Sequence, residues 1–497
     1  MNQPPRQRAN PTSCLAAPEP NGKPRSAPGD WCWRNRIPLA LAGFFLAYAA
    51  AFVAKGEQSE WYDVFVLAAR RMQRGEPLQD FPSNYTYPPA MAMLATPLCH
   101  LSASVSLAAW YLVNVVAAVA VVTCAWGLAG GPPLWRLPPR WQSVFWIGLL
   151  LGGRWFVAPL EHQQFDMVIA ALLLAGCRAG QNGRQRLGAV LIGVSASMKC
   201  VPLLFAPYLL WRGKPQAALL VVAVAVGINL LPDLFFPRSD GGLHWVAWAQ
   251  VYLLAPARVA PGGWLTDPLQ NQSLAGLFDH LFRFGLPVST ALIHGVELPP
   301  GAALPMRWLT YATAAVLTAY SVWRCGSPWR PLAPAAAPSP APANWNQVRT
   351  GVEAAIVVCL QLLLSPMTGK AHFVVLLLPC FLFARQLVER TTRARLALLA
   401  ALLVCGPLTT KGLTGMTLGD LTLAWSVPTW FILGLLWAMW SLLATIQRDC
   451  PAEAGMPSMT ACAAAASSPP ANRVIHGFSS SSPSVFVASG SVTTRSN

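Results

Sequence analysis

The chain has 497 residues, of which 54% are hydrophobic and only 11% are charged. A soluble domain carries about 25% charged residues, so this composition excludes an ordinary soluble protein. The net charge of +16 is compatible with a nucleic-acid partner, but the arginines lie in short loops between apolar runs, where they act as topology signals. The twelve cysteines form no CxxC pair, which disfavours disulfides and a metal site. We therefore expect neither a nucleic-acid partner nor a metal centre.

Apolar segments of about 20 residues recur along the chain, which predicts an all-α, polytopic transmembrane bundle of roughly 10–12 spans. Residues 1–36 and 450–497 are polar or rich in Ala, Ser and Pro, and we expect a disordered cytoplasmic arm and tail there. Residues 37–446 form the predicted membrane domain, with a cytoplasmic Pro/Ala linker at 324–349. The predicted spans lie near 37–54, 103–129, 143–160, 165–178, 216–236, 306–323, 351–366, 373–388, 395–410 and 427–446.

Residues 187–211 form one apolar run that is interrupted by Lys199 and Pro202 and flanked by basic residues on both sides. The basic residues before the first span place the N-terminus in the cytoplasm. A single crossing at 187–211 would then put Arg212, Lys214 and every later basic loop outside. A hairpin of short or broken helices keeps those loops inside, so we predict a hairpin. It places Lys199 near the apex, within the membrane or at its outer face.

The first outer loop, residues 55–102, carries an acid, arginines and tyrosines directly beside an apolar span. The apolar spacing of WYDVFVLAARRM predicts an amphipathic helix in the membrane interface. YPPAMAMLATPL predicts a second interfacial helix, with Pro89 near its first turn. Asp63 lies one or two turns beyond the first span, at the water–lipid boundary. Partial desolvation there can raise the pKa of an acid and let it accept a proton from a hydroxyl.

The polar residues that are hardest to explain as solvated surface all fall on one predicted side of the membrane. An ionisable side chain near the bilayer centre costs about 2.5–3.5 kcal/mol, so such groups usually mark a site or a pathway. We expect them to converge on one outward-facing cavity. They are Asp63, Glu161, His162, Gln164, Asp166, Lys199, Asn271, Lys370 and His372.

Six short motifs carry a family resemblance, in the order DVFVLAARRMQRGEPL, YTYPPAMAML, EHQQFD, KCVP, NQSL and SPMTGKAH. Over about residues 37–446 the chain resembles glycosyltransferase family 87. These are membrane enzymes of the GT-C class, and some are polyprenyl-phosphate-mannose-dependent mannosyltransferases. The resemblance implies inverting transfer of a sugar, mannose in the first instance, from a polyprenyl-phosphate carrier to a hydroxyl of a glycolipid or glycan acceptor. It implies no metal or other cofactor, and a site on the outer face of a bacterial inner membrane.

The resemblance also implies roles for individual residues. Asp63 matches the acid that serves as general base. Negative charge grows on the leaving lipid phosphate, so cations must be placed beforehand. The candidates for binding this donor phosphate are Lys199, Lys370, His372 and Arg154. The candidates for contacting the sugar or its carrier are Tyr87, Glu161, Gln164 and Asn271.

Plainer roles compete with these. Asp63 can cap a helix or pair with Arg70, Lys199 can snorkel to the interface, His372 can pack as a neutral ring, and Arg154 can neutralise an acid. The rival function is a secondary transporter or lipid flippase that uses the same intramembrane charges. The absence of a visible internal repeat and the one-sided placement of the polar groups disfavour it. A third alternative is an inactive scaffold.

Overall fold

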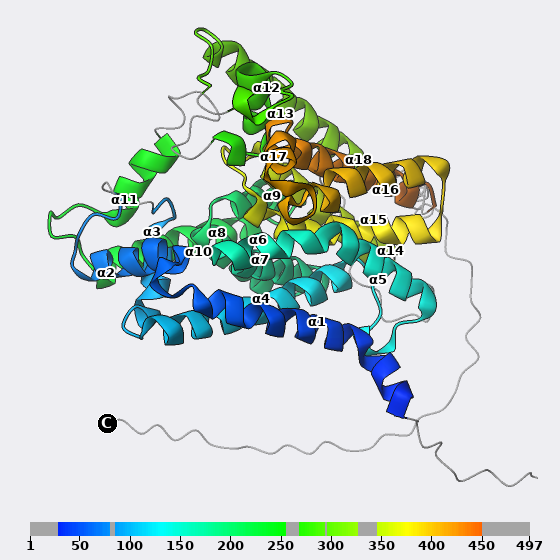
Figure 1. The fold of residues 1–497 in the computed structure, drawn as a ribbon, viewed down its shortest axis with the longest axis horizontal. Coiled ribbons are helices and arrows are strands. Elements are labelled where there is room, and N and C mark those ends of the chain that lie inside the picture. Colours follow the sequence, from blue (N-terminus) through cyan, green and yellow to red (C-terminus); the bar gives the residue numbers. More distant parts are fainter. Residues whose placement is uncertain (1–27, 80–84, 255–267, 294–295, 327–344, 450–497) are drawn as a thin grey trace, which may run out of the picture. The chain divides into compact units, whose positions relative to one another are not determined.

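The computed structural model describes residues 28–79, 85–254, 268–293, 296–326 and 345–449 (Figure 1). Every regular element in these residues is a helix, as predicted, and they contain no strand. The tail 450–497, most of the predicted arm and most of the predicted linker lie outside them. The α-helices are α1 (Pro28–Ala54), α2 (Leu67–Gln73), α3 (Pro89–Ala95), α4 (Ala103–Leu128), α5 (Pro139–Gly152), α6 (Val157–His162), α7 (Asp166–Gln181), α8 (Gln185–Met198), α9 (Phe205–Trp211), α10 (Pro215–Phe235), α11 (His244–Ala249), α12 (Leu274–Phe284), α13 (Ala303–Cys325), α14 (Trp345–Leu364), α15 (Leu377–Glu389), α16 (Arg393–Cys405), α17 (Lys411–Ala424) and α18 (Val427–Asp449).

Five helical segments in the described residues are long and apolar enough to cross a membrane, so the chain is an integral membrane protein. Their outer faces explain the high hydrophobic content. On α10, for example, Leu219 and Leu234 are more than two-thirds exposed, which water would disfavour and lipid does not. The predicted total of ten to twelve spans stays a prediction. The five segments are Ala103–Leu128, Pro139–His162, Pro215–Phe235, Lys370–Glu389 and Val427–Arg448.

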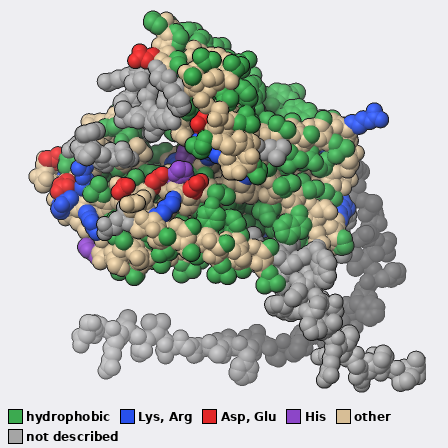
Figure 2. Space-filling model, viewed as in Figure 1, with side chains coloured by type: hydrophobic (Ala, Val, Ile, Leu, Met, Phe, Trp, Pro, Cys, Tyr) green, Lys and Arg blue, Asp and Glu red, His purple; other side chains and the backbone are tan. Residues whose placement is uncertain are grey.

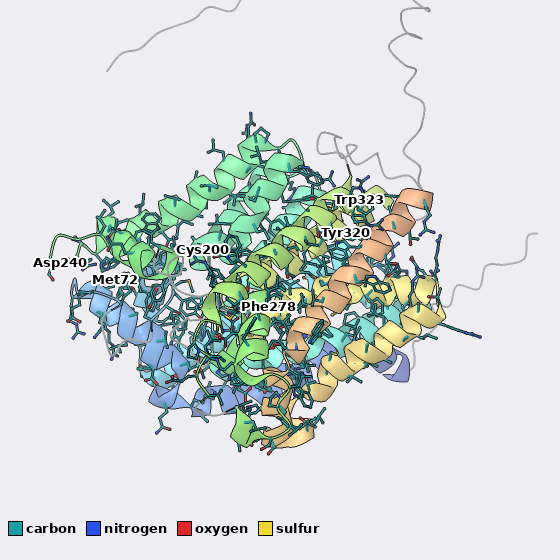
Figure 3. All side chains as sticks on the ribbon, turned by 90° about the horizontal axis from the view of Figure 1, so that it is seen from above. Met72, Cys200, Asp240, Phe278, Tyr320 and Trp323 are labelled. Atoms are coloured by element: carbon teal, nitrogen blue, oxygen red, sulfur yellow. The ribbon has the colours of Figure 1, made fainter. Side chains whose placement is uncertain are left out.

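Close helix packing in the bundle depends on small residues. α15 packs against α5, where a Cβ added to Gly148 would lie 2.3 Å from the Phe381 ring. α14 approaches α4 so closely that a Cβ added to Gly351 would lie 2.3 Å from a backbone oxygen of α4. Small residues allow helix backbones to approach in this way, which strengthens van der Waals packing in lipid. Aromatic contacts join other helices, as where the ring of Tyr320 in α13 lies 4.6 Å from that of Trp440 in α18. Tyr320 is labelled in Figure 3.

The predicted hairpin at 187–211 is confirmed. α8 ends at Met198, the backbone becomes extended at Lys199, and the chain resumes as a 3-10 helix, Val201–Leu204, that leads into α9. Both α8 and α9 pack on α10. A single pocket is lined by the first turns of α8 and by residues beyond the end of α9, so the chain returns to the end at which it entered.

The two helices predicted in the first outer loop are present. The first is a π-helix, Trp61–Val66, that continues into α2, and the second is α3, with Pro89 at its first position. The amphipathic pattern of an interfacial helix implied that Trp61 faces lipid, but the structure shows otherwise. It is fully buried, stacks on Trp110 of α4 at 4.4 Å and donates a hydrogen bond to Ser106. This packing fixes the start of the loop against the bundle.

Candidate active site

Three interruptions of helical structure deliver the polar residues to one place. α7 begins at Asp166, directly after a turn in which Gln163 adopts a left-handed backbone conformation with φ of 54°. Lys199 occupies the break between α8 and α9. His372 lies in a 3-10 helix, Lys370–Leu376, that precedes α15 and packs on α7. Histidine and charged side chains gather in a hollow of an otherwise largely apolar face (Figure 2).

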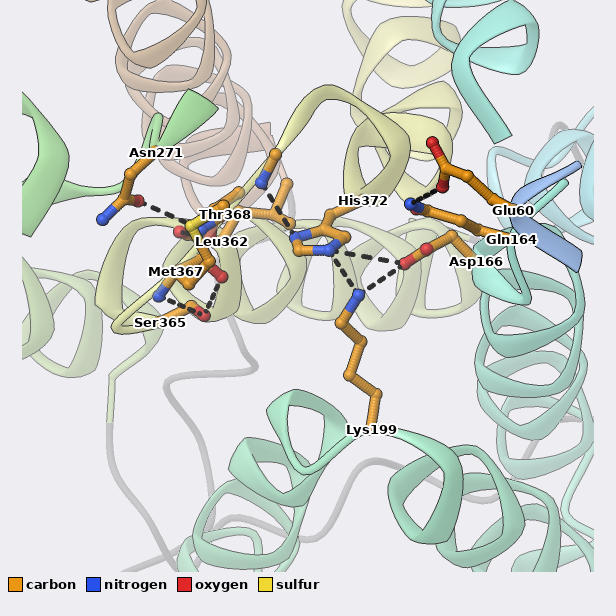
Figure 4. A network of polar contacts seen from close by, with 11 residues as sticks. Glu60, Gln164, Asp166, Lys199, Asn271, Leu362, Ser365, Met367, Thr368 and His372 are labelled. Atoms are coloured by element: carbon orange, nitrogen blue, oxygen red, sulfur yellow. Dashed lines mark hydrogen bonds and ion pairs between the residues drawn. The ribbon is translucent and has the colours of Figure 1, made fainter. Parts of the chain in front are cut away.

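At the centre of this site, Asp166, Lys199 and His372 form a compact cluster (Figure 4). The Lys199 ammonium donates to Asp166 Oδ1 at 2.9 Å, and His372 Nε2 lies 3.7 Å from the same oxygen and also contacts Lys199. The Asp166 side chain is 4% exposed, whereas that of Lys199 is 20% exposed. One buried acid therefore holds two nitrogen groups at the edge of a polar opening.

The hydrogen-bond inventory of this cluster is unbalanced. His372 Nδ1 accepts a bond from the Gly369 amide at 3.1 Å, so the neutral ring carries its proton on Nε2, where it faces Lys199 and Asp166. Two donors thus approach each other. Asp166 Oδ2, in contrast, is buried without a hydrogen-bond partner among the described residues. A ligand that supplies an acceptor to the two donors, or a hydroxyl to the carboxylate, would complete the cluster.

Tyr87 lies beside this cluster, with its half-buried ring 5.4 Å from the Lys199 ammonium in a cation–π contact. Burial raises the pKa of Tyr87, so its hydroxyl remains protonated and can donate a hydrogen bond. The structure therefore places Tyr87 beside Lys199, which in turn contacts His372.

Glu60 is an acid that the sequence interpretation missed. It accepts a hydrogen bond from His162 Nδ1 at 2.6 Å. It also accepts one from Gln164 Nε2 at 3.1 Å (Figure 4). Burial raises the pKa of Glu60, but the His162 and Gln164 hydrogen bonds and the nearby charges of His162 and Lys55 outweigh it and hold the pKa below its ordinary value. Glu60 is thus a firm hydrogen-bond acceptor at the rim of the site. Its place just before a predicted interfacial helix was the only available signal.

A second basic group lies at the start of the 3-10 helix, two residues before His372. Lys370 is half-buried, and Arg154, Lys411, Asp420 and Glu161 act on it electrostatically. Lys411 pairs with Asp420 at 2.7 Å.

Arg154 in this group is a brace. It donates to the Gly406 carbonyl at 2.6 Å and to the Thr409 hydroxyl, and its guanidinium lies 4.3 Å from the Trp155 ring. Arg154 therefore anchors a loop, while Lys370 has no recorded hydrogen bond among the described residues. Lys411, at the start of α17, was absent from the predicted cations.

Asn271 is buried and braces two loops. Its amide nitrogen donates to the Pro366 carbonyl at 3.0 Å, and its oxygen accepts from Ser273 and from the Thr368 amide at 3.1 Å. With 3% exposure and this set of partners, the amide has little capacity left for a sugar. Asn271 thus positions the turn that leads into Lys370 and His372, and its predicted sugar contact stays a prediction.

Asp63 and Glu161 are both exposed. Asp63 lies in the π-helix three residues after Glu60, and no hydrogen bond or ion pair of its side chain is recorded within the described residues. Glu161, at the end of α6, accepts a bond from Lys55 through its backbone oxygen. Their predicted roles stay predictions.

Comparisons with known proteins bear on this site. The family model of glycosyltransferase family 87 matches residues 85–338, which are 254 of the 497 residues. A polyprenol-phosphate-mannose-dependent alpha-(1-2)-phosphatidylinositol pentamannoside mannosyltransferase from Mycobacterium tuberculosis (strain CDC 1551 / Oshkosh) is 27% identical over 156 residues, which are 31% of this chain and 35% of that protein. The chain therefore matches about a third of that relative's length. No solved structure matches the chain.

Proposed function

Because the chain belongs to glycosyltransferase family 87, we propose that it transfers a hexose, mannose, from a polyprenyl-phosphate carrier to a hydroxyl of a glycolipid or glycan acceptor. The observation that carries this proposal is the unbalanced cluster of Asp166, Lys199 and His372, whose spare donors and spare acceptor oxygen suit a sugar phosphate. The relative's name supports a lipid-linked mannose donor. A carrier of this kind stays in the membrane, and the site lies within a membrane bundle.

The cations of the site stabilise the leaving group. As the bond between the anomeric carbon and the phosphate oxygen breaks, negative charge grows on the lipid phosphate. Lys199 and the Nε2–H of His372 converge from two elements and can donate to that phosphate. Lys370 adds a second positive charge from the same 3-10 helix as His372. Removal of one preorganised donor of this type costs about 10²–10³-fold in kcat.

Asp63 is the proposed general base. The acceptor oxygen attacks the anomeric carbon on the face opposite the phosphate, its proton passes to the Asp63 carboxylate, and polyprenyl phosphate leaves with the electrons of the broken bond. The stereochemistry at the anomeric carbon is therefore inverted. Glu60 is the second candidate, because it lies at the rim with two hydrogen-bonded partners. Its lowered pKa makes it a weaker proton acceptor than a free carboxylate, so it is better suited to orient a hydroxyl.

Further side chains recognise the sugar. Tyr87 lies beside Lys199 and presents a hydroxyl, Gln164 presents an amide next to Glu60, and Glu161 is exposed. Asn271 acts indirectly by holding the turn before Lys370.

The basic loops of the α8–α9 hairpin lie at the end opposite Lys199, which supports placing the site on the non-cytoplasmic face. We propose a bacterial inner membrane as its location.

The test is transfer by the purified protein in nanodiscs that contain labelled polyprenyl-phosphate mannose and a membrane glycolipid extract. We expect label in the glycolipid product with the wild type, about 10²–10⁴-fold slower transfer with Asp63→Asn, and a smaller reduction with Glu60→Gln. If Asp63→Asn is active and Glu60→Gln is not, Glu60 is the base. If no label reaches the glycolipid product from polyprenyl-phosphate mannose, glucose or arabinose, the proposed transferase activity is wrong. Label that crosses the bilayer on an intact donor would indicate a transporter.

A further inference from the structure

A pocket lies at the far end of α8 from the candidate active site. It is a small, partly open cavity between helices. Its polar lining comes from Gln185, Tyr208, Arg212, Lys214 and Thr350. The pocket extends along α8 from Gln185 to Ile192. At about 1.5 Å per residue, the 14 residues of α8 place Gln185 roughly 21 Å from Lys199 along the helix axis. The pocket is therefore distinct from the site that holds the transferred sugar.

The charged residues that line this pocket are Arg212 and Lys214, while Glu353 and Arg349 adjoin Arg212 without lining the pocket. Glu353 is fully buried and accepts hydrogen bonds from Arg212 Nε at 2.9 Å, from Arg349 Nε at 3.0 Å and from the Tyr208 hydroxyl at 3.0 Å. One carboxylate thus serves two guanidinium groups. Lys214 is a third, half-buried cation, and no hydrogen bond or ion pair of its ammonium is recorded in the described part of the chain. Three cations against one acid leave an excess of two positive charges.

The helix geometry adds to this positive field. α8 begins at Gln185 and α10 begins directly after Lys214, so the positive ends of two helix dipoles lie at the pocket. Buried excess charge is costly in a membrane protein unless an anion compensates it. The excess positive charge lies beside an open cavity between helices. An external anion can therefore enter and compensate it.

The surroundings of the pocket identify the anion. Leu187 on α8 and Leu210 on α9, next to the lining residues, are 46% and 54% exposed, as expected of surfaces that contact acyl chains. The basic loops make this the cytoplasmic end under the positive-inside rule, where anionic lipids bind to basic pockets between helices. We propose that this pocket binds the phosphate headgroup of an anionic membrane phospholipid, with Lys214 as the accessible cation and Arg212 as the fixed charge behind it.

The test is lipid binding to the full chain in detergent, measured by native mass spectrometry with dioleoyl phosphatidylglycerol and with dioleoyl phosphatidylcholine as the zwitterionic reference. We expect the wild type to retain phosphatidylglycerol in preference to phosphatidylcholine. Lys214→Gln should weaken phosphatidylglycerol binding about fivefold or more, while Lys214→Arg should preserve it. The matched control is Arg393→Gln, which removes an exposed charge at the start of α16, outside the pocket. It should leave binding unchanged.

Three results would overturn the proposal. The first is equal phosphatidylglycerol binding by the wild type and Lys214→Gln. The second is equal retention of the two lipids by the wild type. The third is displacement of phosphatidylglycerol by millimolar inorganic phosphate, which would assign the pocket to a free phosphate ion. Lys214→Gln leaves the Arg212–Glu353 pair intact, so we expect it to fold, and elution of a monodisperse protein on gel filtration checks this. None of these outcomes depends on sugar transfer.

Discussion

The ion pair between Asp166 and Lys199 offers a quantitative test of the site's electrostatics. Lys199→Met would leave the Asp166 carboxylate, 4% exposed, with only His372 at 3.7 Å as a charge partner. Loss of one partner of a buried pair costs about 3–5 kcal/mol, and we expect a value near the lower end because His372 can become protonated. Asp166→Asn should cost less, about 1–2 kcal/mol, because the Lys199 ammonium is 20% exposed and can extend toward water.

The double variant Asp166→Asn/Lys199→Met removes both charges, so it should be more stable than Lys199→Met alone. The expected coupling energy is about 1.5–3 kcal/mol, in the range measured for residues in one network. The assay is unfolding of the four proteins in mixed micelles titrated with SDS, followed by tryptophan fluorescence. If the stability losses of the two single variants simply add in the double variant, the two charges do not compensate each other in the folded protein. A larger loss of stability for Asp166→Asn than for Lys199→Met would contradict the finding that Asp166 is the more deeply buried partner.

The remaining predictions concern the base, a buried charge network and helix packing. Asp63→Asn should lower the rate of transfer about 10²–10⁴-fold with the protein still folded, and more than a tenth of wild-type turnover would contradict a role as base. Glu353→Ala should destabilise the protein by about 3–5 kcal/mol in SDS titration, because it removes the carboxylate that compensates the buried Arg212 charge. An unchanged midpoint would argue against the burial of this charge pair. Gly188→Ala places a Cβ 2.7 Å from a backbone oxygen of α7 and should cost about 1–3 kcal/mol. Gly180→Ala, whose Cβ meets nothing within 4 Å, should be close to neutral, and equal losses for the two would contradict this packing.

The features that the sequence predicted well are those fixed by local composition. The hairpin at 187–211 follows from basic residues on both flanks and from Lys199 in the middle of an apolar run. The two helices of the first outer loop follow from apolar spacing and from Pro89. In each case residues close together in the chain carry the signal, and the membrane allows few alternatives for them.

The features that were missed depend on residues far apart in the chain. Glu60 looked like solvated surface, and only the approach of the α6–α7 turn, 100 residues later, gives it the partners His162 and Gln164. Asn271 looked like a sugar contact, but the turn before Lys370 occupies its amide. Arg154 likewise braces a loop 252 residues away. Hydropathy patterns identify polar residues in apolar surroundings, but they do not show which of them satisfy one another.

The most direct test of the proposed chemistry is the fate of the carrier in a reaction with purified wild-type protein. Polyprenyl-phosphate mannose labelled in both the sugar and the lipid would be incubated with the glycolipid acceptor, and both products would be quantified. Glycosyl transfer predicts one polyprenyl phosphate released for each mannose attached, with inverted anomeric configuration and no release without an acceptor. Recovery of intact donor, or a product formed equally well from a nucleotide sugar, would contradict it.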